Sequence, residues 1–306
     1  MRNKYVCPLC NSSDNQLIEV INTDEIKDAY LRYLNVKADL KAKEIRYIVC
    51  SSCNLGFFDP MATGDEKFYE QLQKFDWYYM TDKPEYYLAK KYLPSAGKVL
   101  EVGSGKAAFA KVVGKDNYVG LEFNDEAISR AKSTGINLIK ESIENHAISH
   151  AKQYAAVVSF QVLEHVSNPS AFIQGCVDSL QVGGHLILAV PNHDGICGLA
   201  QNSFLDLPPH HVSHWGEKTM QYIAAHYDLE LVSIDTEGVS DFHLTWGAKA
   251  IYEAKLRETF GLKSKLIDTS FFAKAIAKVA SILLRIISPD LSSLKGHTIL
   301  ACYKKK

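Results

Sequence analysis

Residues 99–110, VLEVGSGKAAFA, constrain the fold more than any other part of the chain. A short apolar run leads into Gly103 and Gly105, and a helix is expected to follow them. Glycine allows unusual backbone dihedrals and the close approach of a ligand, because it carries no side chain. The next apolar run ends at Glu122, seventeen residues beyond Gly105, where a carboxylate can accept hydrogen bonds from both ribose hydroxyls. The loop and the acid together predict a nucleoside site in a parallel α/β sheet.

From residue 98 onward, short apolar runs alternate with amphipathic stretches, as expected for a parallel sheet covered by helices. Seven strands are predicted, at residues 98–102, 117–121, 137–140, 155–160, 185–190, 230–235 and 298–303. Helices are predicted between them, at residues 106–113, 124–133, 143–152, 169–180 and 217–227. The expected fold class is therefore α/β, a Rossmann-like seven-stranded domain.

Two long segments interrupt this alternation, residues 191–216 and residues 238–295. Insertions after strand C-termini usually build the substrate side of such a sheet. Within the second, residues 271–288 show helical apolar spacing, which predicts a buried lid or dimer helix, with a membrane-surface helix as the alternative. We expect three parts: a zinc-binding module at residues 1–62, two helices covering the cofactor site at 63–94, and the sheet domain at 95–306.

The N-terminal part contains two CxxC pairs, formed by Cys7 and Cys10 and by Cys50 and Cys53. This spacing indicates one tetrahedral Zn²⁺ held by four thiolates, although four unrelated thiols are the alternative. Four protein ligands leave no open coordination position, so the Zn²⁺ is expected to be structural in a zinc-ribbon-like module. Phe57 and Phe58 are expected to cap the site, and residues 23–43 to form a helix between the two pairs.

Charge and hydropathy limit the function classes. The 306-residue chain has a formal net charge of -1 at pH 7, and residues 304–306 are its one block of lysines. A nucleic-acid partner is therefore not expected. No apolar leader precedes the cysteines, and no stretch approaches the roughly 18 consecutive apolar residues of a membrane span. The expectation is a cytoplasmic protein without a membrane span.

Around the glycine loop and in the motifs after it, over residues 95–237 and the closing strand, the sequence resembles the class I S-adenosylmethionine-dependent methyltransferases. In that family an acidic residue ends the first strand before the glycine loop, and Glu101, Gly103 and Gly105 match this pattern. Ala107 replaces the third glycine of the family pattern. The resemblance implies S-adenosylmethionine as the cofactor and a methyltransferase activity.

The resemblance also assigns residues in later motifs. It implies that Ser142 and Ile143 lie against the adenine edge, and that Gln161, Glu164 and His165 face the cofactor or the substrate. A dinucleotide-binding dehydrogenase is the alternative for the loop, but it would show three glycines as GxGxxG and no LEH after the fourth strand.

Methyl transfer to a hydroxyl requires alignment of the acceptor and removal of its proton, and histidine suits that task near neutral pH. His210 and His211 follow the fifth strand and are predicted as the base, with His165 as the reserve. The alternatives are histidines that only stabilise the loop, or a metal site made by HHxxH, which includes His214.

The cysteine module, a tyrosine-rich linker and PPHH also resemble methyltransferases of deoxysugar and surface-polysaccharide pathways. This resemblance implies a nucleotide-linked sugar as the acceptor, with four linker tyrosines near it: Tyr78, Tyr79, Tyr86 and Tyr87. An RNA methyltransferase is the alternative, which the neutral charge disfavours. A non-catalytic binding protein is a third class.

Overall fold

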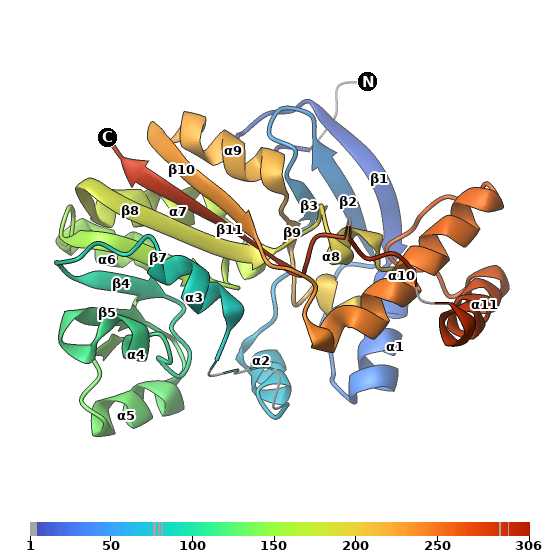
Figure 1. The fold of residues 1–306 in the computed structure, drawn as a ribbon, viewed down its shortest axis with the longest axis horizontal. Coiled ribbons are helices and arrows are strands. Elements are labelled where there is room, and N and C mark those ends of the chain that lie inside the picture. Colours follow the sequence, from blue (N-terminus) through green and yellow to red (C-terminus); the bar gives the residue numbers. More distant parts are fainter. Residues whose placement is uncertain (1–4, 76–77, 79, 81, 288, 293) are drawn as a thin grey trace.

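The computed structural model describes residues 5–306 apart from residues 76–77, 79, 81, 288 and 293. Within this part of the chain, the strands form a seven-stranded sheet and a four-stranded sheet (Figure 1). One hydrophobic core cluster contains residues of both sheets, so the two pack against each other.

The seven-stranded sheet contains every strand that the apolar runs predict. These are β4 (Val99–Val102), β5 (Tyr118–Leu121), β6 (Leu138–Ile139), β7 (Tyr154–Phe160), β8 (Leu180–Pro191), β10 (Leu229–Thr236) and β11 (Thr298–Lys305). Their order is β10-β11-β8-β7-β4-β5-β6. Strand β11 runs antiparallel to both neighbours, whereas the pairs from β8 to β6 are parallel. The chain order reverses between β4 and β7, which is where open α/β sheets bind ligands.

Helices cover both faces of this sheet, which explains why β4 and β7 are buried along their whole length. Neighbouring side chains of β4 alternate between faces: Val99 lies in the core cluster of Phe109, and Leu100 in the core cluster of Phe172. The covering helices are α3 (Pro84–Lys90) and α4 (Ala110–Val113) on the first face, and α6 (Ile143–Ser149), α7 (Pro169–Ser179) and α9 (Glu217–His226) on the second. Helix α5 (Asp125–Ser133) packs beside β6.

The four-stranded sheet is antiparallel and has the order β1-β2-β3-β9. Its strands are β1 (Asn15–Asn22), β2 (Glu44–Cys50), β3 (Gly56–Asp59) and β9 (Ser213–His214). The last of them comes from the predicted insertion at residues 191–216 and pairs with β3 at Gly56 and Phe57. Strand β9 therefore connects the N-terminal sheet to the end of β8.

The helix predicted at residues 23–43 is wrong in its length, because α1 (Thr23–Leu34) ends at Asn35. Asn35 has a left-handed backbone, with φ 54° and ψ 36°, and its N–H donates to the carbonyls of Tyr30 and Leu31. Asparagine tolerates this conformation and stops a helix. Within α1, Ile26 and Tyr30 are buried, whereas Tyr33 is 64% exposed.

The helix predicted at residues 106–113 is also shorter, since α4 spans only Ala110–Val113. Ala107 has φ 54°, a left-handed conformation that costs a non-glycine residue about 1 kcal/mol. The third glycine of the family pattern would adopt it without that cost. The position therefore keeps the backbone geometry of a glycine although its residue is alanine.

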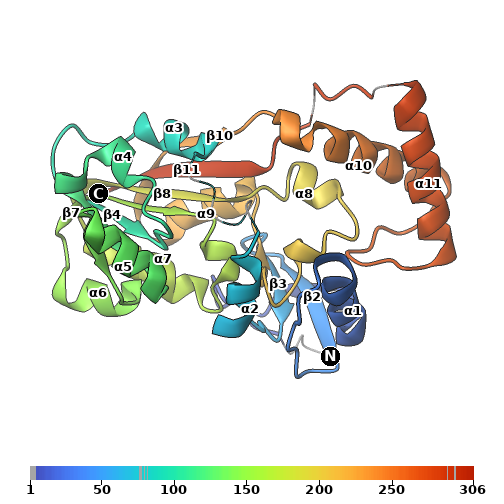
Figure 2. The same cartoon turned by 90° about the horizontal axis from the view of Figure 1, so that it is seen from below.

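Outside the two sheets, α2 (Glu66–Leu72) precedes α3, so residues 63–94 contain two helices, as predicted. The insertions contain α8 (Ile196–Leu199), α10 (Asp241–Thr259) and α11 (Phe271–Ile286). Helix α11 packs on α10 through one face, and both extend away from the seven-stranded sheet (Figure 2). Its opposite side leaves Phe271, Phe272 and Ile286 exposed. Among the described residues, no helix has the length and apolar character that crossing a membrane requires.

Candidate active site

A single cavity of about 1610 Å³ lies at the carboxyl ends of the parallel strands. It is lined both by the glycine loop after β4 and by the histidine loop after β8. Every residue predicted to bind the cofactor or act in catalysis lines this cavity: Glu101, Gly103, Gly105, Glu122, Ser142, Ile143, Gln161, His165, His210 and His211. Sequence positions more than a hundred residues apart thus meet at the switch point of the sheet.

The glycine loop requires glycine at its first position. Gly103 has φ 76°, and a Cβ there would lie 2.4 Å from the Val162 side chain. Gly103 and Ser104 both donate their N–H to the Leu121 carbonyl, which anchors the loop to β5. Gly105 has φ 51°, so it also lies in the left-handed region that favours glycine. The loop keeps its backbone open to the cavity.

Glu122 follows β5 and its carboxylate is held by three backbone donors. Oε2 accepts from the Gly105 N–H at 2.6 Å, and Oε1 accepts from the Phe123 and Asn124 N–H groups at 2.8 and 2.9 Å. These hydrogen bonds fix the carboxylate beside the glycine loop. Its orientation suits the predicted role as a ribose acceptor.

Glu101 lies beneath the loop and is 2% exposed. Its carboxyl accepts a hydrogen bond from the Tyr118 hydroxyl. Burial raises the pKa of Glu101 to about 8, because the ionised form loses its hydration. The carboxyl is therefore mainly protonated at neutral pH.

The three other predicted cofactor residues take different places around the cavity. Ser142 caps α6, its Oγ accepting from the Asn145 N–H at 3.3 Å, and the following Ile143 is buried. Gln161 ends β7 with a left-handed backbone, φ 57°, and its Nε2 lies 3.4 Å from the Thr298 hydroxyl.

The predicted catalytic histidines form one cluster, although His165 is 45 residues from His210. His165 Nδ1 donates to the His210 carbonyl at 2.6 Å, and His210 Nδ1 donates to the Leu205 carbonyl at 2.8 Å. His211 Nδ1 donates to Asp206 Oδ1 at 2.7 Å. Burial lowers the pKa of His165 to about 3 and that of His210 well below its usual value. Both rings are therefore neutral at physiological pH.

Asp206 is the residue whose part in the site the sequence interpretation missed. Besides His211, its carboxylate accepts from His193 Nε2 at 2.7 Å, and its backbone carbonyl accepts from His214 Nε2 at 2.8 Å. Burial opposes ionisation of Asp206, but the interactions with His193 and His214 outweigh it and hold its pKa well below the usual range. An acid five residues before a buried histidine in the same loop was the available signal.

The HHxxH segment does not act as one ligand set. His214 lies with His193 and Asp206, whereas His210 and His211 lie with His165. The stacked rings of His193 and His214 are 3.6 Å apart and are separate from the first cluster. The predicted alternative, one metal site made by all three histidines of HHxxH, is therefore wrong, because His214 belongs to a different group from His210 and His211.

Glu164, between Leu163 and His165, is 1% exposed, and neither of its carboxyl oxygens has a hydrogen-bond partner. Its Oε1 lies 3.7 Å from His165 Nε2 and 4.0 Å from His211 Nε2. Burial raises its pKa to about 7, although His211 partly offsets this effect. An unpartnered buried carboxyl is costly and marks a functional site.

The linker tyrosines only partly agree with the prediction. Tyr78 and Tyr86 line the cavity, and Tyr79 lies outside the described residues. Tyr87 does not line it, because its ring is 60% exposed and its hydroxyl donates to Asp82. Other aromatic residues do line the acceptor side, including Tyr69 and Trp246.

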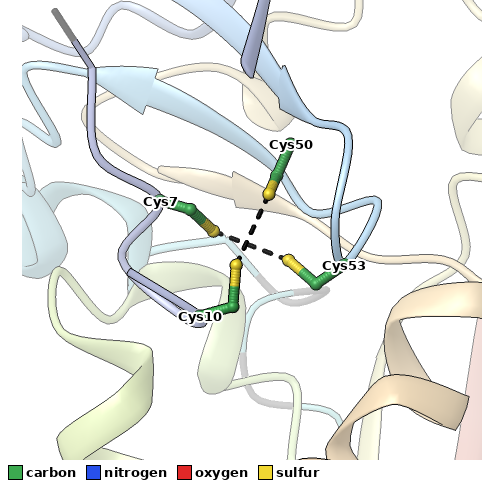
Figure 3. A group of neighbouring side chains, drawn as sticks. All are labelled: Cys7, Cys10, Cys50 and Cys53. Carbon is green, nitrogen blue, oxygen red and sulfur yellow. Dashed lines mark hydrogen bonds between the residues drawn. The ribbon is translucent and has the colours of Figure 1, made fainter. Parts of the chain in front are cut away.

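Away from the cavity, the four paired cysteines point their sulfurs at one another (Figure 3). The Sγ atoms of Cys7 and Cys53, and those of Cys10 and Cys50, are 3.5 Å apart, so no disulfide joins them. The four sulfurs lie within 4.8 Å of one another, as a shared metal would require. Phe57 belongs to the same core cluster, but Phe58 packs into a different one, so the predicted cap is wrong for Phe58.

The seven-stranded sheet with a cofactor cleft at its switch point defines a Rossmann-like enzyme of the class I methyltransferase type. The family model described as "Methyltransferase domain" matches residues 70–234, more than half of the chain. The chain therefore belongs to this family of S-adenosylmethionine-dependent methyltransferases.

Curated relatives match a shorter region. A ubiquinone biosynthesis O-methyltransferase of Shewanella pealeana is 35% identical over 105 residues, which cover 32% of this chain and 44% of the relative. That of Escherichia fergusonii is 32% identical over 106 residues, with the same coverage of 32% and 44%. The matches thus span less than half of the length of these relatives.

Solved structures with a similar fold include two S-adenosylmethionine-dependent methyltransferases. That from Archaeoglobus fulgidus has a TM-score of 0.48 and 18% identity, and covers 72% of this chain and 94% of its own. That from Mesorhizobium loti has a TM-score of 0.47 and 12% identity, and covers 74% and 100%.

Replacing Glu101 by Gln should change how stability depends on pH. In the wild type the folded-state pKa of Glu101, about 8, exceeds the ordinary value of 4.5. The contribution of the protonated Glu101 carboxyl to the unfolding free energy is therefore complete below pH 4.5 and is lost as the pH rises through 8. The loss amounts to about 1.4 kcal/mol per pH unit in that window. We expect the difference in unfolding free energy between Glu101→Gln and the wild type to grow in favour of the variant between pH 5 and 8, as measured by denaturant titration without cofactor. The exposed Glu25→Gln is the control. If the unfolding free energies of the wild type and of Glu101→Gln depended equally on pH, the raised pKa of Glu101 would be contradicted.

Proposed function

We propose that this chain transfers the methyl group of S-adenosylmethionine to a hydroxyl oxygen of a small-molecule acceptor. One observation carries the proposal: the same cavity is lined by the glycine loop with Glu122 and by three histidines, each of which donates a hydrogen bond through its Nδ1 atom. When bound, S-adenosylmethionine supplies an activated methyl group on a sulfonium. Because transfer is an in-line displacement, the chain must align the acceptor oxygen and remove its proton.

The residues of the cofactor half fit this group. Gly103 leaves the loop without a side chain at its closest approach, and Glu122 presents a fixed carboxylate for the ribose hydroxyls. Ser142 and Ile143 border the region proposed for adenine. Glu101 and Gln161 lie at the ends of β4 and β7, beside the proposed position of the methionine portion. These assignments are supported by the common cavity.

His211 is the proposed base. Its Nδ1–H donates to the Asp206 carboxylate, so Nε2 carries the lone pair that can accept a proton. A buried carboxylate also stabilises the imidazolium that forms. His210 and His165 have lowered pKa values and hydrogen-bond only to backbone carbonyls through Nδ1, so they suit positioning of the acceptor better than proton removal.

The acceptor proposed from the sequence is a nucleotide-linked sugar. A second class, a phenol, is favoured by the aromatic lining, and the names of the relatives state methyl transfer to oxygen in ubiquinone biosynthesis. The described lining contains twelve Asp and Glu residues against three lysines. Even with Glu101 and Glu164 protonated, carboxylates outnumber lysines there, which disfavours a diphosphate and also RNA. A neutral hydroxyl compound, either a sugar or a phenol, therefore matches the cavity better than a polyanion.

We also propose that residues 1–62 hold one structural Zn²⁺ through Cys7, Cys10, Cys50 and Cys53. The support is the approach of four free sulfurs from two turns. Strand β3 of this module pairs with β9, which carries the histidine loop, so the module supports the acceptor wall. Residues 63–94 are proposed to cover the cofactor site, and residues 95–306 to form the catalytic domain.

Replacing Glu122 by Ala should weaken S-adenosylmethionine binding by about 1.5 to 3 kcal/mol, because the ribose hydroxyls lose a charged acceptor. Calorimetric titration measures this, with the exposed Glu25→Ala as the control. Tight NAD binding by the wild type without S-adenosylmethionine affinity would refute the proposed cofactor.

Replacing His211 by Gln should lower turnover about 10²- to 10⁴-fold while S-adenosylmethionine affinity stays nearly unchanged. The residual rate should rise with pH, because the acceptor then ionises without help. Initial rates from pH 6 to 9, with a panel of sugar and phenol acceptors and mass detection of the methylated product, give the profile. The surface variant His226→Ala is the control. Full turnover of His211→Gln would show that His211 is not the base.

Replacing Cys50 by Ser should remove one metal equivalent and destabilise the N-terminal module. Elemental analysis of wild type and variant, both prepared without chelators, counts the metal, and thermal unfolding reports the loss of stability. The buried Cys176→Ser lies outside the cysteine group and serves as the matched control. Identical metal content in Cys50→Ser and the wild type would contradict the four-thiolate site.

A further inference from the structure

Beyond the cysteine group, the cavity contains a second set of side chains with the arrangement of metal ligands. One ligand atom from each of His165, His210 and His211 lies within 4.8 Å of the others. Glu164 Oε1 lies 3.7 Å from His165 Nε2 and 4.0 Å from His211 Nε2. Two ligands of one Zn²⁺ are roughly 3.4 Å apart, given bonds of about 2.1 Å. Small side-chain shifts would therefore close this set around one cation.

The tautomer of each ring follows from its partner. The Nδ1 atoms of His165 and His210 face backbone carbonyls, and that of His211 faces a carboxylate, all of which only accept hydrogen bonds. Each Nδ1 must therefore carry the proton, which leaves a lone pair on each Nε2. Metal-ligating histidines are held in this way, with the second nitrogen bonded to a carbonyl or carboxylate. Among the described residues, none hydrogen-bonds to these Nε2 atoms.

Glu164 supplies an independent observation. Its side chain is 1% exposed and borders the cavity, yet both oxygens lack a hydrogen-bond partner in the described structure. Native proteins rarely leave buried carboxyl oxygens unpaired, because the lost hydration is not replaced. A cation at the centre of the cluster would satisfy Oε1.

The neighbouring group of His193, Asp206 and His214 shows the contrast. There the Asp206 carboxylate accepts from His193 Nε2 at 2.7 Å and the Asp206 backbone carbonyl accepts from His214 Nε2 at 2.8 Å, while His214 Nδ1 has no partner among the described residues. Both carboxylate oxygens of Asp206 are occupied by ring N–H groups, of His193 and of His211, so this group serves to orient His211. In the cluster of His165, His210 and His211, by contrast, the Nε2 lone pairs remain available to a ligand in the cavity.

We infer that His165, His210, His211 and Glu164 form a binding site for one divalent transition metal at the acceptor side of the cavity. Three imidazoles with one carboxylate select Zn²⁺, Fe²⁺ or a similar ion over Mg²⁺ and Ca²⁺, which prefer oxygen ligands alone. The site opens into the cavity, so an acceptor oxygen can complete the coordination shell. The inference deepens the proposed function: a bound cation would orient the acceptor hydroxyl and lower its pKa, whereas in the metal-free site His211 accepts the proton.

Co²⁺ is a suitable probe, because its spectrum distinguishes thiolate from nitrogen and oxygen ligands. We expect full-length protein, freed of metal and titrated with Co²⁺, to bind two equivalents. One should show sulfur-to-metal charge transfer from the cysteine site, and the other only ligand-field bands. Cys50→Ser should lose the first signal and keep the second. Glu164→Gln and His165→Ala should bind the second equivalent at least about tenfold more weakly and keep the first.

Two controls make the result decisive. His226→Ala, on the surface, should retain both equivalents, and cooperative thermal unfolding of Glu164→Gln, followed by circular dichroism, should show that this variant is folded. Uptake of the thiolate equivalent alone by the wild type would overturn the inference, as would unchanged second-site affinity in both cluster variants. Failure of the proposed function is read separately, as absence of S-adenosylmethionine binding in calorimetry, which leaves the Co²⁺ titration unaffected.

Discussion

The buried carboxylate of Asp206 is the interaction on which the acceptor side depends. Its two oxygens accept hydrogen bonds from His193 and His211, and its backbone carbonyl accepts one from His214. Because His193 follows β8 and His214 lies in β9, this single residue joins the end of the catalytic sheet to the N-terminal sheet. The charged form is retained in the interior only because several donors compensate its lost hydration. Removing the charge of Asp206 would therefore leave the tautomer of His211 unfixed and would also weaken the conformation of the loop.

Strand β9 extends this connection to the cysteine module. It pairs with β3, and the adjoining Val212 both donates its N–H to the Glu164 carbonyl and accepts from the Phe58 N–H. The loop between Asp206 and Trp215 is thus held on one side by the segment after β7 and on the other by the N-terminal sheet. If the N-terminal module did not fold, β3 would be lost, and the loop that carries the histidine cluster would lose one of its supports. The pairing of β3 with β9 is the contact through which the proposed module would support the proposed acceptor side of the cavity.

The sequence predicted the catalytic sheet well, because strands buried on both faces, such as β4 and β7, appear as short apolar runs. It predicted α1 too long, because Asn35 ends the helix through a left-handed backbone conformation that apolar spacing does not reveal. The grouping of the histidines escaped it for a different reason. His210 and His214 are close in sequence, yet one ring lies with His165 and the other with His193, which only tertiary structure reveals.

The two halves of the cavity are specified by different kinds of information. On the cofactor side, Gly103, Gly105 and Glu122 lie within twenty residues, and backbone hydrogen bonds between adjacent strands fix their geometry. On the acceptor side, His165 and His210 come from separate loops, and their geometry depends on Asp206 and β9. Substitutions in the insertion at 191–216 can therefore reshape acceptor recognition while the hydrogen bonds that hold Glu122 stay intact. This separation explains why a local motif suffices to identify the cofactor class, whereas the acceptor class must be argued from the charge and shape of the assembled cavity.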